Sequence, residues 1–569
     1  MAPDDGIARK TPPLTIREQA EHVLRLAPAE RLKFLIEAPK PLPLVRALPD
    51  GDFYLTVREV GPDDAGPLLQ LASAPQLTHL LDLEGWRGDR FDPLRCGAWV
   101  ALLAETGEPT LKRFVRNADD ETLVLLFRDW AHVRPLEIDH EEPTRGHGVS
   151  DAGDERGFIS PDGGHLFAPE RPEHVLAVRR LAETLYLDDQ PRYAGLIRTA
   201  LFDLPSEVEE SALRWRLSRL EEHGYPPLEE ATQIYEPPAG AHTPPPAPAP
   251  PSDDGLAASH AALRVLGPRG LIATGVDALP PEARERVLFG LSSLANRVLV
   301  ADAADAGSID AHRRVLERAA SYVSLALEAR GAHDGAHAAP ILAEVFAVDL
   351  FREGYQQAAA LRLRARQVLA TGWGGGHAHA LDLLDGPLRA RVSALLQPRP
   401  LYVETAEDGA SHPRDFRRVA EIEETRLTLD LADSLAKILL AGTGTSAASI
   451  LDEERHPFEE RARFSTLLLT MLAWHAARGA LRIERLPQDV IADFLRTTAS
   501  RRTASPEAAT RAMEKLLDAV APQAAPDRRV AASLRLFAAT CLDRLAADCG
   551  GLVPGTPVTP RVVGCLRIA

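Results

Sequence analysis

Prolines recur at short, regular intervals through the first part of the chain. Five of them follow one another at spacings of ten to thirteen residues: Pro28, Pro39, Pro49, Pro62 and Pro75. Each is followed by polar or acidic residues and then by apolar residues at helical spacing. Proline is tolerated in the first turn of a helix, where its missing N–H needs no partner, and acidic residues suit the positive end of the helix dipole. Each such cassette therefore predicts the start of a short helix.

The apolar residues of a cassette fall on one helical face. After Pro62, residues Ala65, Leu68, Leu69 and Ala72 occupy positions i, i+3, i+4 and i+7. Helices of two or three turns are not stable alone in water and have to bury this face against a neighbour. Residues 14–135 are therefore predicted to form a superhelical domain of stacked short helices.

Two of these cassettes resemble the short-helix superhelix of the magnesium-transporter N-terminal domain and of the flagellar motor-switch protein. They are Leu26-Ala27-Pro28-Ala29-Glu30-Arg31-Leu32 and the stretch from Gly61 to Leu69. The order of segments along the whole chain, with residues 83–90 and 224–231, is also similar to a family of uncharacterised bacterial proteins. The superhelix implies an interaction or regulatory module by analogy of fold. The bacterial family implies no activity.

The remainder of the chain divides by composition. A Pro161-Asp162-Gly163 turn between apolar residues predicts a small hairpin, and a run of prolines between Thr243 and Pro251 predicts an extended spacer. Beyond the spacer longer helices are expected, among them 281–300, 339–369, 378–396 and 415–441. The predicted parts are 136–235 with loop, hairpin and helices, a proline-rich linker at 236–255, helical domains at 256–400 and 401–553, and an extended tail at 554–569. The expected fold class is all-α.

Charge and hydropathy exclude some kinds of partner. The net charge of −17 disfavours binding to nucleic acid, which needs Lys and Arg to displace phosphate counterions. The longest apolar stretch, residues 467–477, is shorter than the ~20 residues that a membrane-spanning helix needs. We therefore expect no nucleic-acid partner and no membrane insertion.

The cysteines and the N-terminus indicate a cytoplasmic protein. Cys96, Cys541, Cys549 and Cys565 show no C-x-x-C spacing, so they are interpreted as reduced, mostly buried thiols rather than as a disulfide framework or a zinc site. The first residues have no apolar core and include Asp4 and Asp5, unlike a signal peptide.

His377 and His379 are the candidate metal ligands of the chain. They follow a glycine-rich run at 372–376, whose flexibility suits a binding loop. Alternate residues of a helix do not share a face, however, and no acidic or cysteine partner has a ligand spacing. The alternative interpretation is a helix N-terminus after a glycine-rich turn.

Other motifs fail on spacing or context. Residues 453–456 contain a single Glu-x-x-His where di-iron bundles need two, and residues 140–143 lack the second histidine of a zinc protease. Residues 442–447 match the residue pattern of a dinucleotide-binding loop, G-x-G-x-x-A. Such a loop follows a strand, however, and a helix is expected before these residues. Five carboxylates along one predicted helix are interpreted as its solvated face: Glu421, Glu423, Glu424, Asp430 and Asp433.

These observations favour a non-enzymatic helical scaffold that binds a partner protein, with no cofactor and no catalytic residue assigned. The sequence leaves two alternatives open. One is an enzyme or a metal- or ligand-binding protein with its site in the helical C-terminal half, near His377 and His379. The other is a regulatory module that responds to divalent cations, as the resemblance to the transporter domain implies. The oligomeric state is not predicted.

Overall fold

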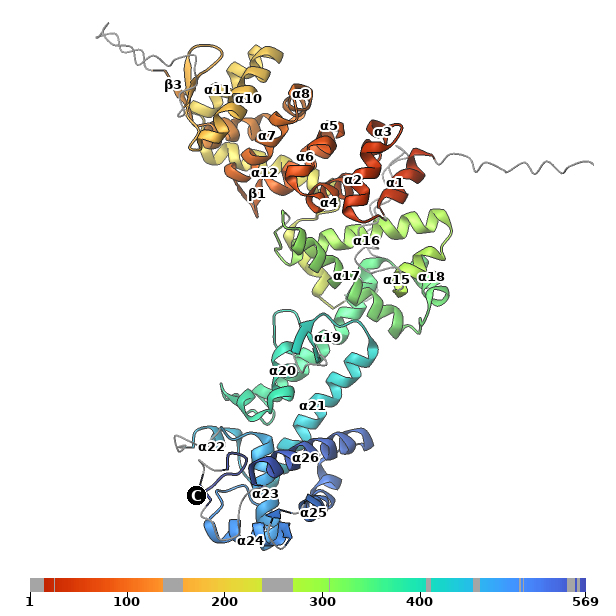
Figure 1. Cartoon of the computed structure of the whole chain (residues 1–569), viewed down its shortest axis with the longest axis vertical. Coiled ribbons are helices and arrows are strands. Elements are labelled where there is room, and N and C mark those ends of the chain that lie inside the picture. The colour runs from red at the N-terminus through yellow and green to blue at the C-terminus, as the bar shows by residue number, and fades with distance from the viewer. Residues whose placement is uncertain are drawn as a thin grey trace, which may run out of the picture. The chain divides into compact units, whose positions relative to one another are not determined.

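Helices dominate the computed structural model of the chain, with only small pairs of strands among them (Figure 1). This confirms the predicted all-α class. The chain forms two compact units, Met1–Arg352 and Glu353–Ala569, and each is described by itself. The structure describes residues 15–24, 26–136, 157–237, 270–305, 307–405, 411–453, 461–500, 503–504, 506–525, 527–549, 558–559 and 563–569. The proline run at 243–251 and the 140–143 motif lie outside these residues.

The first unit begins with short helices in close succession. Their bounds are α1 (Ile16–Leu24), α2 (Pro28–Glu37), α3 (Pro41–Arg46), α4 (Asp50–Val60), η1 (Pro62–Asp64), α5 (Gly66–Leu71), α6 (Ala74–Glu84), α7 (Pro93–Glu105), α8 (Glu108–Asn117) and α9 (Asp120–Leu125). A two-residue hairpin of β1 (Trp86–Arg87) and β2 (Arg90–Phe91) separates α6 from α7.

Proline initiates these helices as predicted. Pro28 is the first residue of α2, Pro62 opens η1, Pro75 lies in the first turn of α6, and Pro49 stands directly before α4. The prediction is wrong only for Pro39, because α3 begins two residues later, at Pro41.

The apolar stripe after Pro62 is fully buried, which confirms that the short helices stack. Ala65, Leu68, Leu69 and Ala72 are inaccessible to solvent. A buried arginine strengthens the first stack, since Arg31 of α2 donates to Thr56 Oγ1 of α4 at 3.0 Å and pairs with Glu59 at 2.7 Å.

A small antiparallel sheet follows the short helices. Its strands are β3 (Val133–Pro135), β4 (Phe158–Ile159) and β5 (His165–Phe167), in the order β3-β5-β4. The β4–β5 pair encloses the Pro161-Asp162-Gly163 turn, so the predicted hairpin is confirmed. β3, which precedes this hairpin in the chain, pairs with β5 and was not predicted.

The rest of the first unit is helical. It comprises α10 (Val175–Asp188), α11 (Gln190–Phe202), α12 (Pro205–Glu222), α13 (Leu228–Thr232), α15 (Leu271–Asp277), α16 (Pro281–Ala301), α17 (Ile309–Ala329), α18 (Gly335–Glu344) and three 3₁₀ or π turns, η2 (Leu126–Trp130), η3 (Pro172–His174) and η4 (Gln233–Tyr235). α17 packs against α4, so the short helices and the later helices belong to one unit.

The second unit is built around a helix, α23 (Phe464–Arg478), whose first ten residues are buried. Its elements are the greater part of α19 (Ala347–Ala370), η5 (Ala380–Leu383), α20 (Gly386–Leu395), β6 (Tyr402–Thr405), β7 (Ser411–Arg414), α21 (Val419–Leu439), η6 (Ala441–Thr443), α22 (Ala447–Leu451), α23 (Phe464–Arg478), α24 (Gln488–Thr498), β8 (Ala499–Ser500), β9 (Thr503–Ala504), α25 (Pro506–Ala524) and α26 (Arg528–Cys549). Residues 464–473 of α23 are all buried, and α21, α24, α25 and α26 pack around it. The longest apolar stretch of the sequence is thus the core helix of this unit.

Two predicted helices differ from the observed ones. The helix expected at 339–369 is broken into α18 and α19, because Val345 adopts an extended backbone after Glu344. The helix expected from 378 starts only at Gly386, after the 3₁₀ turn η5. Within the described residues, no helix combines the length and apolarity required to cross a membrane.

Trp130 sets a tight packing constraint in the first unit. It ends the π turn η2, is buried, and donates from Nε1 to His174 Nδ1 at 2.9 Å. Its indole lies on Gly97 of α7, where a Cβ would come within 2.3 Å of Trp130 Nε1. Only glycine fits beneath this ring.

We predict that Gly97→Ala lowers the free energy of unfolding by about 2 kcal/mol or more, because the indole has to move within a packed core. Gly195→Ala is the matched control, since Gly195 lies inside α11 with nothing within 4 Å of the added Cβ. That variant should gain about 0.5–1 kcal/mol from its higher helix propensity. Urea denaturation followed by circular dichroism measures both, and equal stabilities of the two variants would contradict the packing constraint.

Candidate functional site

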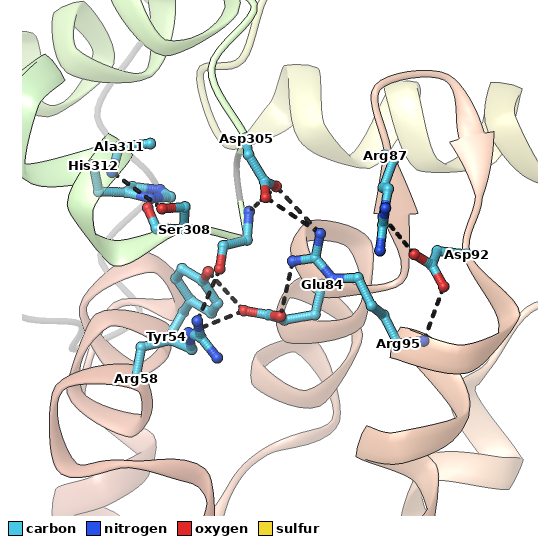
Figure 2. Close-up of polar contacts among 11 residues, drawn as sticks. Tyr54, Arg58, Glu84, Arg87, Asp92, Arg95, Asp305, Ser308, Ala311 and His312 are labelled. Carbon is cyan, nitrogen blue, oxygen red and sulfur yellow. Dashed lines mark hydrogen bonds and ion pairs between the residues drawn. The ribbon is translucent and has the colours of Figure 1, made fainter.

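Polar side chains of the first unit converge where α4, α6 and α7 meet the turn before α17 (Figure 2). Glu84, the last residue of α6, lies at the centre of this group and is only 3% exposed. A buried carboxylate is costly unless it is paired and hydrogen-bonded. Its partners therefore define the site, which we call the Glu84 junction: Tyr54, Arg58, Glu84, Arg95, Asp305 and Gly307.

Three side chains engage the Glu84 carboxylate. Tyr54 Oη donates to Oε1 at 2.9 Å, and Arg58 Nε pairs with the same oxygen at 3.2 Å. Arg95 Nη2 approaches Oε2 at 3.3 Å. Burial, and next the nearby Glu84 charge, raise the pKa of Tyr54, so its hydroxyl stays protonated as the donor.

The two arginines extend the junction to the turn before α17. Arg95 Nη1 pairs with Asp305 Oδ2 at 3.3 Å, and Arg58 Nη2 donates to the Gly307 carbonyl at 3.0 Å. The Gly307 N–H donates to Asp305 Oδ1 at 2.9 Å. Burial opposes the charge of Arg95, but Asp305 and Glu84 outweigh it and raise its pKa. Two arginine side chains, Arg58 and Arg95, thus join α4 and α7 to a turn that follows them by more than 200 residues in the sequence.

Local capping places Arg95 in this position. Asp92 is the N-cap of α7 and accepts from the Arg95 N–H at 3.0 Å, while its other oxygen pairs with Arg87 Nε at 2.6 Å. Figure 2 shows Asp92 between these two arginines. The cap fixes the first turn of α7, from which the Arg95 side chain reaches both Glu84 and Asp305.

The chemistry of the junction is that of a structural clamp. Both Glu84 oxygens are engaged, and Glu84 and Asp305 compensate the guanidinium groups of Arg58 and Arg95. A general base needs a free lone pair directed at a substrate proton. The Glu84 carboxylate is instead committed to holding three helices and one turn together.

Histidines form a second group beside the junction. His79 of α6 is buried, neither of its ring nitrogens has a hydrogen-bond partner, and its ring centroid lies 4.4 Å from that of His223. His223 Nε2 is 3.6 Å from Asp50 Oδ2. Burial, followed by the neighbouring histidines His223 and His312, lowers the pKa of His79 far below its ordinary value. His79 is therefore a neutral core side chain.

His312 connects this group to the turn before α17. Its ring lies 5.6 Å from that of Tyr54, and its Nδ1 is 3.1 Å from the Ser308 carbonyl. Because a carbonyl only accepts, Nδ1 carries the proton. Burial lowers the pKa of His312, so the imidazole stays neutral.

Helix α12 is fastened to the short helices by a third polar group. Arg219 makes two hydrogen bonds to the Asp82 carboxylate, at 2.7 and 2.8 Å, and Arg216 donates to the Asp82 carbonyl at 2.7 Å. The Arg216 guanidinium also lies over the Trp86 ring, 5.2 Å from its centroid. These contacts fix one face of α12 firmly against α6 and β1.

The structure places the candidate metal ligands His377 and His379 in the turn after α19, before η5. Their ring centroids are 5.9 Å apart, and His377 Nδ1 accepts the backbone N–H of His379 at 3.1 Å. His377 Nε2 contacts Asp452 at 3.1 Å, and His379 Nδ1 is 3.8 Å from Asp382. Across the part of the chain that the structure describes, no three or more His, Cys, Asp or Glu side chains gather in a metal-binding arrangement.

The remaining motifs resolve into structural features. Residues 442–447 follow the helix α21 and contain Gly444 in the left-handed conformation, so the expectation of a helix before them instead of a strand is confirmed. Of the 453–456 motif, only Glu453 lies among the described residues, and it pairs with Arg485 at 2.9 Å. The five carboxylates along α21 form ion pairs: Glu421 with Arg414, Glu423 with Arg426, Glu424 with Arg391, and Asp430 and Asp433 with Arg364.

Sequence reasoning missed the Glu84 junction. Glu84 stands within the 83–90 segment that carries the resemblance to the bacterial family, but no spacing links it to Asp305. The local signal that was available is the N-cap Asp92, three residues before Arg95. An ion pair between residues more than 200 positions apart, such as Arg95 and Asp305, produces no periodic pattern that could be recognised in the sequence.

We predict that Glu84→Gln destabilises the first unit by about 3 kcal/mol, because it leaves Arg58 and Arg95 without their buried counter-charge. The matched control is Glu210→Gln, which breaks an exposed pair with Arg214 on α12 and should change stability by less than about 0.5 kcal/mol. Urea denaturation of both variants measures the difference. Two variants of equal stability would show that Glu84 does not hold the junction.

We predict that the first unit loses stability as pH falls from 7.5 to 5.5. The pKa values of His79 and His312 are lowered in the fold, so below about pH 6.5 the unfolded chain takes up protons that the folded chain excludes. Each such histidine removes up to about 1.4 kcal/mol per pH unit. His79→Phe should flatten the pH dependence measured by urea denaturation; an unchanged slope in this variant would refute the assignment of His79 as a neutral core residue.

Comparison with known proteins gives a match that covers almost the whole chain. A family model described as a family of unknown function (DUF6178) matches residues 8–569. No curated protein and no solved structure matches the chain. None of these comparisons shows the expected resemblance of residues 14–135 to the magnesium-transporter and motor-switch superhelix. By the extent of the family match, the chain belongs to the DUF6178 family.

Proposed function

We propose that this protein is a non-enzymatic helical scaffold that binds a partner protein through the outer face of α12 and the end of α11. The observation that carries the proposal is a group of large apolar side chains exposed there. Phe202 is 75% exposed, Leu204 61% and Trp215 56%. We call these three residues the α12 stripe.

Helix geometry aligns two members of the stripe. Leu204, directly before α12, and Trp215 are eleven residues apart, which is about three turns and brings both to nearly the same side. Phe202, the last residue of α11, lies two residues before Leu204. Single exposed apolar residues are common on protein surfaces. Three large ones within fourteen residues, a tryptophan and a phenylalanine among them, match the aromatic enrichment at the core of protein interfaces.

An adjoining face of α12, about a quarter turn around the helix from the α12 stripe, is packed and supports a rigid docking platform. Val208, Ala212, Arg216 and Leu220 are buried, and the arginine contacts to Asp82 and Trp86 hold this side in place. A fixed platform loses little conformational freedom when a partner binds, which favours affinity. The exposed apolar side of α12 is therefore preorganised.

The charges beside the stripe indicate what a partner would present. Asp203 and Glu207 are exposed and flank Leu204. A partner with an apolar centre bordered by Lys or Arg would complement both features. We also infer a bacterial and cytoplasmic setting, which the resemblance to the bacterial family and the four buried, unbridged thiols support.

We predict that a photo-crosslinking amino acid at position 215 captures a defined partner protein in the native cell. The control is the same amino acid at position 536, because Leu536 is also exposed but lies on α26 of the other unit. With the purified partner, Trp215→Ala or Phe202→Ser should weaken binding by at least about 30-fold, the loss typical of a hot spot. Leu536→Ser should leave the affinity within about twofold, and calorimetric titration measures all three.

Unchanged affinity in both stripe variants would overturn the assignment of the docking surface. An equal loss in the Leu536→Ser variant would do the same, because it would show a non-specific apolar effect. Circular dichroism of each variant establishes that the helices remain folded. The stripe side chains are exposed, so the substitutions leave the packed face of α12 intact.

A further inference from the structure

Two cysteines that are distant in the sequence meet in the second unit. Cys549 is the last residue of α26, and Cys565 belongs to the C-terminal segment 563–569. Both side chains are buried, and their thiols are in hydrogen-bonding contact with each other. Cys96 and Cys541 are also buried, but neither has a cysteine in such contact.

Independent anchors bring the two thiols together. Helix α26 packs against α21, α23 and α25. The C-terminal segment is held by Ile568, which forms a parallel bridge with Leu486, and by Arg567, whose N–H donates to Thr470 Oγ1 at 3.1 Å. The Arg567 side chain donates to the Ile483 carbonyl at 2.7 Å and pairs with Glu453. Each cysteine therefore lies on a separately anchored segment, Cys549 on α26 and Cys565 on the C-terminal segment.

The surroundings of the pair favour one thiol as the first nucleophile. The hydrogen bond from Cys565 lowers the pKa of Cys549, while the same contact and burial raise the pKa of Cys565. Asp548, a half-buried neighbour, also contacts the Cys565 thiol and can accept its proton. A thiol with a lowered pKa beside a second, resolving cysteine is the arrangement of redox-sensitive sites.

We propose that Cys549 and Cys565 form a redox-sensitive thiol pair, which a peroxide oxidises to a disulfide that fixes the C-terminal segment to α26. The proposal is independent of partner binding at the α12 stripe, which belongs to the other unit. It adds a modification site to the chain. Reduction of the disulfide by a dithiol restores the pair.

The oxidation proceeds in two balanced steps. The Cys549 thiolate attacks one oxygen of hydrogen peroxide, the O–O bond breaks, and Cys549 becomes a sulfenic acid as hydroxide leaves and is protonated to water. Cys565 then attacks the Cys549 sulfur, and its proton passes through Asp548 to the departing sulfenic hydroxyl, which leaves as a second water. The two thiols lose two electrons in total, and the peroxide gains them.

The experiment treats reduced, full-length protein with hydrogen peroxide, blocks the remaining thiols by alkylation and maps the peptides by mass spectrometry. We expect the four free thiols to fall to two, with Cys549 linked to Cys565 and with Cys96 and Cys541 alkylated. The new link closes a loop of about 15 residues, which should raise the melting temperature of the second unit by about 5–10 °C. Dithiothreitol should reverse both changes.

The variants separate the pair from the other cysteines. Cys549→Ser and Cys565→Ser should each abolish the link and the melting shift. Cys541→Ser is the matched control on the same helix, and it should retain both. If a serine variant fails to fold, the peptide map of the oxidised wild-type chain still shows whether Cys549 and Cys565 are linked.

Three outcomes would overturn the proposal. They are four free thiols after prolonged oxidation, a sulfinic acid at Cys549 without any link, and a link that involves Cys96 or Cys541. Each would show that the contact between Cys549 and Cys565 does not operate as a redox pair.

Discussion

Glu84 carries a negative charge into the interior of the first unit, and the surrounding helices are arranged so that this charge is compensated. Removing a carboxylate from water costs several kcal/mol unless cations and hydrogen bonds replace its hydration. Tyr54, Arg58 and Arg95 replace that hydration from α4 and α7. Because both arginines also bind the turn before α17, the same charge determines where the later helices attach. This junction is one of the contacts that join the stacked helices and the helices after the proline run into one unit.

Local features of the fold could be predicted because their causes lie within a few residues of one another. The missing N–H of Pro28 and the apolar spacing after Pro62 act inside a single turn or two, and the structure confirms both. The turn at Pro161-Asp162-Gly163 is equally local. Where the cause is not local the prediction failed: the extended backbone at Val345, which divides a helix expected to be continuous, follows no glycine and no proline.

The candidate site could not be predicted from the sequence for the same reason. Glu84, Arg95 and Asp305 are ordinary surface residue types in an acidic, arginine-containing chain, and only the fold reveals their pairing. The contact of Cys549 with Cys565 likewise depends on where Leu486 and Thr470 hold the C-terminal segment. His377 and His379, which the sequence made conspicuous by their glycine-rich context, instead make local contacts with Asp452 and Asp382. In this protein, the polar and ionisable residues that lie close together in the sequence are not the ones that the fold brings together in space.

The distance between Glu84 and Asp305 along the chain has a consequence for synthesis. The short helices make most of their contacts with sequence neighbours, so they can fold as they leave the ribosome. At about 5–20 residues per second, roughly 10–45 s pass between the synthesis of Glu84 and that of Asp305. During this interval the Arg95 guanidinium lacks its second carboxylate, and the carbonyl of Gly307 is not yet there for Arg58. The ion pairs and hydrogen bonds of the junction can therefore form completely only after the nascent chain has been extended as far as α17.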